Sequence, residues 1–95
     1  MMNSKEILSM NIKYYRQKYN LSQEDFAEKV GSNLVYINQI ENLKRKPTIE
    51  MLDKIADGMN KNIDKNLNIT GSDLIKYDAN HKTDFVRIDE KKQSN

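Results

Sequence analysis

The chain has 95 residues, of which 37% are apolar and 32% are charged, and its net charge is +2. This length predicts one small domain with a single core and leaves no room for a large enzyme cleft between two domains. The absence of cysteine excludes disulfides and cysteine-based zinc sites and fits the reducing cytoplasm. The apolar runs are too short for a membrane helix, which needs roughly 20 residues, and no signal peptide is expected.

The first predicted helix covers residues 6–18. Its apolar positions are spaced by four, three and four residues, as one face of a helix requires. They are Leu8, Ile12, Tyr15 and Tyr19. Asn20 follows, and asparagine tolerates the left-handed backbone conformation that ends many helices. We therefore expect this helix to end at about Tyr19.

Two short helices are predicted next. Ser22 has the position of an N-cap, whose hydroxyl accepts a hydrogen bond from a backbone N–H two or three residues on. Gly31 is expected to end the helix that Ser22 begins. The inward residues of that helix are Phe26, Ala27 and Val30. Ser32 and Asn33 offer the next N-cap, and the third helix, over residues 34–42, turns Ile37 and Ile40 inward.

A basic loop over residues 43–46 separates the third helix from the fourth. Pro47 ends this loop, and Thr48 is the expected N-cap of the fourth helix. The inward residues predicted for that helix are Ile49, Leu52, Ile55, Ala56 and Met59. A fifth and weaker helix is expected over residues 62–68, buried through Ile63 and Leu67.

The helical pattern weakens from Ile69 onwards. Leu74, Ile75 and Tyr77 are consistent with one more helical turn, whereas residues 84–89 are typical of a short strand. The polar residues 90–95 are expected to be a disordered tail. The sequence therefore predicts an all-α fold of five helices within residues 1–68, which form the helix-turn-helix domain, followed by a C-terminal extension over residues 69–89. The apolar residues of this extension predict a dimer contact with a second copy of the chain, and the alternative is that the extension folds back over the chain's own helices.

The charges are unevenly distributed. Residues 1–47 contain eight basic and five acidic residues, whereas residues 48–95 contain eight basic and nine acidic ones. An anionic partner is therefore expected on the first half, although a solvated surface of mixed charge explains the same numbers. Two short helices joined by a tight turn with a glycine, and followed by a basic loop, have the geometry of a helix-turn-helix, which also occurs as plain structure.

Three segments carry a family resemblance. Residues 21–31 (LSQEDFAEKVG) resemble the first half of the helix-turn-helix in the phage-repressor, Cro and Xre-like family of bacterial regulators. Residues 36–42 (YINQIEN) resemble its recognition helix, and residues 47–56 (PTIEMLDKIA) resemble the helix that follows. The resemblance extends over about residues 7–67 without a gap. It implies a five-helix, repressor-like DNA-binding domain that acts as a dimer on a two-fold operator.

The resemblance also implies which residues face the DNA bases. They are Asn33, Leu34, Val35, Asn38 and Gln39. Leu34 departs from the family pattern, in which a polar reader such as glutamine is common, and Ser32 departs from it because an aliphatic residue is usual there. Leucine and valine can pack on thymine methyl groups but cannot hydrogen-bond to a base. Ordinary packing, or contact with a protein partner, is the alternative role for Leu34 and Val35.

A second group of residues is implied to contact the DNA backbone. It comprises Gln23, Tyr36, Asn42, Lys44, Arg45 and Lys46. Gln23 also matches a glutamine that buttresses the recognition helix, whereas Tyr36 could equally be a packed tyrosine. Basic residues beside a helix in the groove add affinity without sequence information. Arg16 and Glu41 match an ion pair that ties the first helix to the end of the recognition helix, and we expect a partly buried salt bridge.

Other chemistries have little support in the sequence. His81 is the only histidine and has no cysteine or second histidine with which to complete a zinc site. No phosphate-binding loop, dinucleotide fingerprint or nucleophile elbow is present, so we expect no enzyme, no metal and no cofactor. The prediction is a DNA-binding repressor that forms a homodimer. The alternatives are an antitoxin, a restriction-modification controller, or a protein-interaction module of the same fold that binds a regulatory protein.

Overall fold

The computed structural model describes residues 1–81, and within them the fold is all helical. The elements in chain order are α1 (Ser4–Lys18), α2 (Gln23–Lys29), α3 (Leu34–Glu41), α4 (Ile49–Asn62) and the 3-10 helix η1 (Gly71–Ile75). The predicted all-α fold of five helices is confirmed. The strand expected over residues 84–89, with Phe85, Val86 and Ile88, and the tail over residues 90–95 lie outside the described residues.

The helix boundaries follow from local capping chemistry. Each α-helix is preceded by a polar side chain that accepts a hydrogen bond from a backbone N–H three residues on: Asn3, Ser22, Asn33 and Thr48. After three of the helices the chain reverses through a residue with positive φ, at Asn20, Gly31 and Leu43. The predicted caps at Ser22, Asn33 and Thr48 are therefore confirmed, as are the left-handed conformation of Asn20 and the end of α2 before Gly31.

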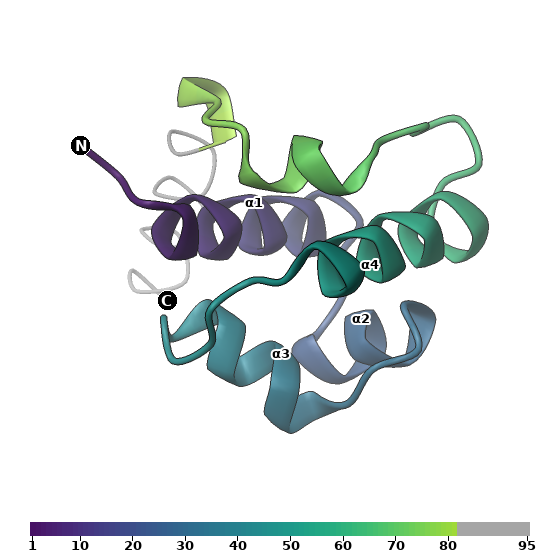
Figure 1. The fold of residues 1–95 in the computed structure, drawn as a ribbon. Coiled ribbons are helices and arrows are strands. Elements are labelled where there is room, and N and C mark those ends of the chain that lie inside the picture. Colours follow the sequence, from purple (N-terminus) through teal and green to yellow (C-terminus); the bar gives the residue numbers. More distant parts are fainter. Residues whose placement is uncertain (82–95) are drawn as a thin grey trace, which may run out of the picture.

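The core lies where α1 and α4 meet the α2–α3 pair. In Figure 1, α1 and α4 run through the middle, with α2 and α3 below them. The buried core consists of Leu8, Ile12, Phe26, Ala27, Val30, Ile37, Ile40, Leu52, Ile55, Ala56, Met59 and Leu74. The prediction that Ile49 points inward is wrong, because Ile49 is 76% exposed. It is the first residue of α4, one turn before Leu52, which is the first buried residue of that helix.

The fifth helix lies elsewhere than the sequence predicts. α4 extends to Asn62, the first residue of the predicted helix, and residues 63–68 then form turns and irregular backbone in which Ile63 and Leu67 are only partly buried. In this region, polar side chains form hydrogen bonds with backbone groups that a helix would otherwise pair with each other. Asp64 accepts from the backbone N–H of Asn66 at 2.9 Å, and the amide of Asn60 pairs with both backbone groups of Ile69 at 2.7 and 3.0 Å. The helical turn at Leu74 and Ile75 is present instead, as η1.

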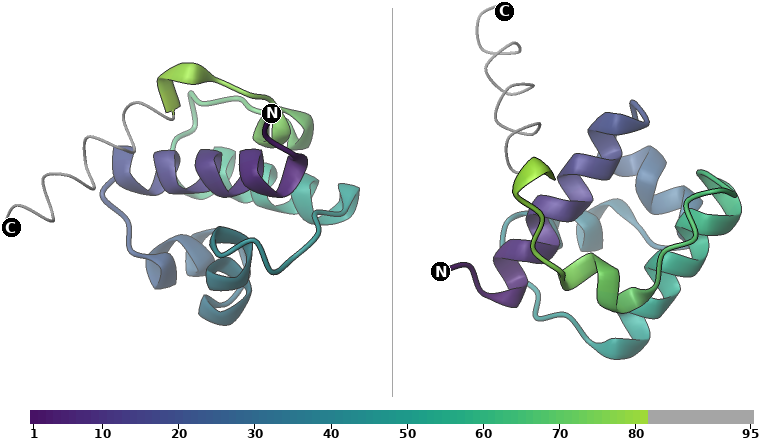
Figure 2. Two further views of the ribbon diagram at one scale, coloured as in Figure 1. Left: turned by 90° about the vertical axis from the view of Figure 1, so that its left-hand side faces the viewer. Right: turned by 90° about the horizontal axis from the view of Figure 1, so that it is seen from above.

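Residues 68–81 fold back over the chain's own helices. Viewed from above, they run across α1 and α4 (right-hand view of Figure 2). Leu74 is fully buried, and the buried Nδ2 of Asn11 on α1 donates to the carbonyl oxygens of Leu74 and Lys76 at 2.8 and 3.1 Å. Tyr77 remains 51% exposed. The beginning of the C-terminal extension is therefore part of the same core as the helix-turn-helix.

Gly58 marks the closest approach of α4 to the end of α2. A Cβ atom at this position would lie 2.6 Å from the Cα atom of Val30, and backbone atoms cannot rotate away as a side chain can. We expect Gly58→Ala to lower the free energy of unfolding by about 1–3 kcal/mol, the usual cost of overpacking. Helix propensity alone would favour alanine by about 1 kcal/mol. A urea denaturation curve that shows stabilisation would contradict this packing, and Asp57→Ala on the exposed side of the same helix is the control.

Candidate nucleic-acid interface

The turn between α2 and α3 leaves one face of α3 on the surface. Val35, Asn38, Gln39 and Asn42 recur at helical spacing and share this face, whereas Ile37, Ile40 and Glu41 are buried on the other side. Leu34 and Val35, at the start of the helix, are 45% and 64% exposed. The exposed face thus combines two apolar side chains with three amides, the composition that base edges and thymine methyl groups require.

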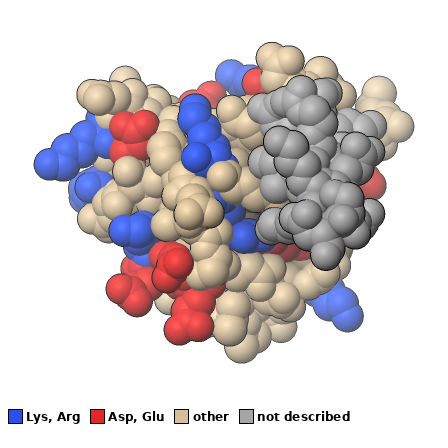
Figure 3. Space-filling model, turned by 180° about the vertical axis from the view of Figure 1, so that it is seen from behind, with Lys and Arg blue, Asp and Glu red and all other residues tan. Residues whose placement is uncertain are grey.

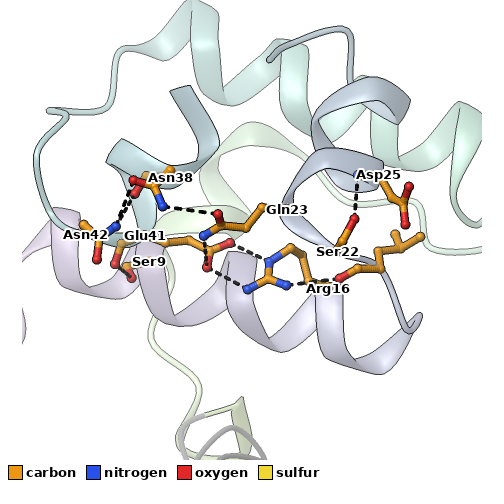
Figure 4. A network of polar contacts seen from close by, with 9 residues as sticks. Ser9, Arg16, Ser22, Gln23, Asp25, Asn38, Glu41 and Asn42 are labelled. Atoms are coloured by element: carbon orange, nitrogen blue, oxygen red, sulfur yellow. Dashed lines mark hydrogen bonds and ion pairs between the residues drawn. The ribbon is translucent and has the colours of Figure 1, made fainter. Parts of the chain in front are cut away.

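Arg16 and Glu41 form a buried ion pair beneath this face (Figure 4). The contacts of the arginine Nε and Nη2 with the two carboxylate oxygens are 2.6 and 2.8 Å long, which is the bidentate geometry of strong arginine–carboxylate pairs. The side chain of Glu41 is 2% exposed and that of Arg16 is 15% exposed. Ser9 also donates to the backbone carbonyl of Glu41 at 2.7 Å. The pair expected from the sequence thus fastens α3 to α1.

A chain of amides connects the ion pair to the surface of α3 (Figure 4). Gln23, at the start of α2, donates to Glu41 at 3.1 Å, and its oxygen accepts from Asn38 at 3.2 Å. Asn42 donates to the side-chain and backbone oxygens of Asn38 at 3.1 and 2.9 Å. Because a carboxylate can only accept, Glu41 fixes which way each amide in this chain points. Gln23 therefore buttresses α3.

Arg45 lies against the opposite edge of the same face. Its Nε donates to the side-chain oxygen of Gln39 at 2.8 Å, and its guanidinium carbon is 4.9 Å from the centre of the Tyr36 ring. Burial raises the pKa of the Tyr36 hydroxyl, an effect that the nearby Arg45 opposes, so this hydroxyl is a hydrogen-bond donor at neutral pH. Lys44 and Lys46 are exposed in the same loop. The structure therefore brings most of the expected DNA-backbone residues to the edges of α3.

Two expected site residues have additional structural roles. Asn33 is the N-cap of α3, and its side-chain oxygen accepts from the backbone N–H of Tyr36 at 2.9 Å. Asn38 is part of the chain of amides. Sequence spacing could have indicated the pairing of Asn38 with Asn42, which are four residues apart on a helix. It could not have indicated the contact of Asn38 with Gln23, because the angle between α2 and α3 brings them together.

Other parts of the described surface have mixed charge and carry no metal-binding cluster. The face seen from behind carries basic and acidic residues side by side (Figure 3). In residues 1–81, no cluster of three or more histidine, aspartate or glutamate side chains could hold a metal ion, and no helix is long and apolar enough to cross a membrane. His81 stacks on Tyr14 at 3.7 Å and contacts Asn11 at 2.7 Å. It thereby joins the C-terminal extension to α1, a role that the sequence did not indicate.

Comparisons with known proteins agree with this geometry. A helix-turn-helix family model matches residues 12–66. The chain is 39% identical over 70 residues to the control protein C.SmaI of Serratia marcescens, which covers 74% of this chain and 83% of that protein. It is 44% identical over 45 residues to an uncharacterized HTH-type transcriptional regulator of Methanocaldococcus jannaschii, which covers 47% of this chain and 68% of that protein. No solved structure matches the chain.

Proposed function

The chain belongs to the Xre/Cro-like helix-turn-helix family of DNA-binding transcriptional regulators, and from this premise we propose that it is a cytoplasmic repressor that inserts α3 into the major groove as a homodimer. The observation that carries the proposal is the exposed face of α3, on which apolar and amide side chains stand between Gln23 at one edge and the basic loop at the other. The major groove is wide enough to admit such a helix.

Within this proposal the base contacts are made from the exposed face of α3 and its N-cap. The residues are Asn33, Leu34, Val35, Asn38 and Gln39. Leu34 and Val35 pack on thymine methyl groups, and the amides contribute hydrogen bonds. The phosphate contacts come from the edges of the face, from Gln23, Tyr36, Asn42, Lys44, Arg45 and Lys46. An amide at the start of α2 is well placed for this, because helix N-termini favour phosphate oxygens.

The similarity to a control protein supports one specific role for this regulator, that of a restriction-modification controller. A restriction-modification controller uses the same chemistry as a repressor and differs in the genes that it regulates. A different class, the protein-interaction module, would instead use Leu34 and Val35 as an apolar patch for a regulatory protein.

Enrichment from random duplex DNA tests the proposal. We expect a two-fold motif with half-sites about 10 base pairs apart, and enrichment of no motif would contradict it.

The basic loop provides a separate test through the salt dependence of binding. Replacing Lys44, Arg45 and Lys46 together with alanine is expected to weaken binding to every duplex and to flatten the slope of affinity against salt by up to roughly one unit per lost phosphate contact. Fluorescence anisotropy over a salt series measures both effects. Lys61→Ala, which changes an exposed lysine on α4 that pairs with Asp57, is the control. A triple variant that binds like the parent at every salt concentration would remove this loop from the interface.

A further inference from the structure

Arg45 has two contacts that a residue serving only to grip phosphates does not need. Its Nε donates to the Oε1 of Gln39, at 2.8 Å, and its guanidinium lies over the ring of Tyr36, with 4.9 Å between the guanidinium carbon and the ring centre. Tyr36 and Gln39 are three residues apart on α3, so they are neighbours on the helix surface. The loop side chain therefore lies across one edge of the helix face that we assign to the bases.

The contact between Arg45 and Gln39 determines the orientation of an amide. An arginine side chain has donors and no acceptor, so the atom of Gln39 that faces Arg45 must be its oxygen. The oxygen and nitrogen of an amide diverge from the same carbon, and holding Oε1 against the loop turns Nε2 away from it. Gln39 thus presents N–H donors to a base, although a glutamine held by nothing could present either atom.

This orientation has a consequence for base selection. A glutamine that recognises adenine uses both amide atoms, since it donates to N7 and accepts from N6. With its oxygen held by Arg45, Gln39 favours a major-groove edge that offers acceptors, namely guanine through O6 and N7 or thymine through O4. We infer that Arg45 is a specificity-determining residue that acts through Gln39 and makes the regulator select guanine or thymine over adenine at one base pair. This inference rests on the proposed function.

The test compares base preferences rather than affinity alone. The base pair that Gln39 contacts is first located as the position of the enriched motif at which Gln39→Ala loses discrimination. The dissociation constants of the parent are then measured for duplexes with the preferred base and with adenine at that position. We expect the parent to disfavour adenine by about tenfold or more, the discrimination typical of a specific amide contact. Arg45→Ala is expected to reduce this ratio to about threefold or less.

Lys44→Ala is the matched control, because it removes the same charge from the same loop and leaves the contacts of Gln39 in place. The one contact of Lys44 with Gln39 is from its backbone N–H to the carbonyl oxygen, at 2.8 Å, and alanine retains it. It should weaken binding to both duplexes and leave their ratio unchanged. If Arg45→Ala behaves like Lys44→Ala, Arg45 contacts only the backbone and this inference is wrong, while the proposed function stands. A parent that already prefers adenine at that position would also overturn it. A parent that prefers no sequence would overturn the proposed function as well.

Discussion

Replacing Glu41 with glutamine is expected to lower the free energy of unfolding by about 3–5 kcal/mol, the cost of breaking a buried ion pair from one side. The carboxylate is 2% exposed and accepts from Arg16 at 2.6 and 2.8 Å and from Gln23 at 3.1 Å. A glutamine has one oxygen and must turn its nitrogen toward one of these donors. Arg16 would then keep its charge at a mostly buried site without a counter-ion. Domains are stable by only about 5–15 kcal/mol, so the effect is large.

Urea denaturation of the parent and of three variants measures this loss. Asp57→Asn removes the acidic partner of an exposed pair with Lys61, and it should cost less than about 1 kcal/mol. Replacing Arg16 and Glu41 together with methionine should cost less than Glu41→Gln alone, because neither charge is then left unpaired. If Glu41→Gln unfolds at the same urea concentration as the parent, the pair contributes no more than a surface pair, and the argument fails.

The parts of the fold that the sequence predicts correctly are those that local chemistry determines. Ser22, Asn33 and Thr48 cap helices because a short polar side chain accepts from a backbone N–H within its own first turn. Gly31 and Asn20 take positive φ because the backbone there must reverse. These interactions span three or four residues, so the sequence around each of them contains the whole signal.

The errors come from interactions between residues far apart in the chain. Two apolar residues predict the fifth helix over residues 62–68, but the side chain of Asn60 hydrogen-bonds to both backbone groups of Ile69, and the chain then crosses α1 (Figure 2). Asn11 is a polar residue in the middle of a helix, and only the approach of Leu74 shows that it is fully buried. Ile49 has the spacing of a core residue, yet the first turn of α4 extends beyond the core.

The candidate site divides in the same way. Family resemblance identifies the positions that face DNA and the partners Arg16 and Glu41, which the structure joins. It does not reveal that Gln23 and Asn38 extend this pair to the surface, or that Arg45 orients Gln39. Those contacts depend on the angle between α2 and α3 and on the path of the loop after Leu43. The assignments of base and phosphate contacts remain predictions, and binding experiments with the variants above test them.

Truncation after Leu67 is expected to abolish cooperative unfolding, although the family resemblance ends there. The truncation removes Leu74, which is fully buried among α1 and α4, and a leucine lost from a core costs about 2–5 kcal/mol. It also leaves the buried amide of Asn11 without the carbonyl groups of Leu74 and Lys76, at a further cost of about 1–3 kcal/mol. Together these two losses are comparable to the lower end of the total free energy of unfolding of a domain, which is roughly 5–15 kcal/mol.

Truncation after His81 is the control, because it retains η1 and the contacts of His81 with Asn11 and Tyr14. This shorter chain should unfold cooperatively, as the parent does, whereas the chain ending at Leu67 should show a broad, shallow circular dichroism transition. A sharp transition at the parent's temperature in the Leu67 truncation would show that η1 contributes nothing to the core.

Sedimentation of the parent and the His81 truncation then tests the homodimer. If the parent dimerises and the His81 truncation does not, the dimer contact requires residues beyond His81. If the parent is monomeric at high micromolar concentration, two copies come together only when both are bound to the operator.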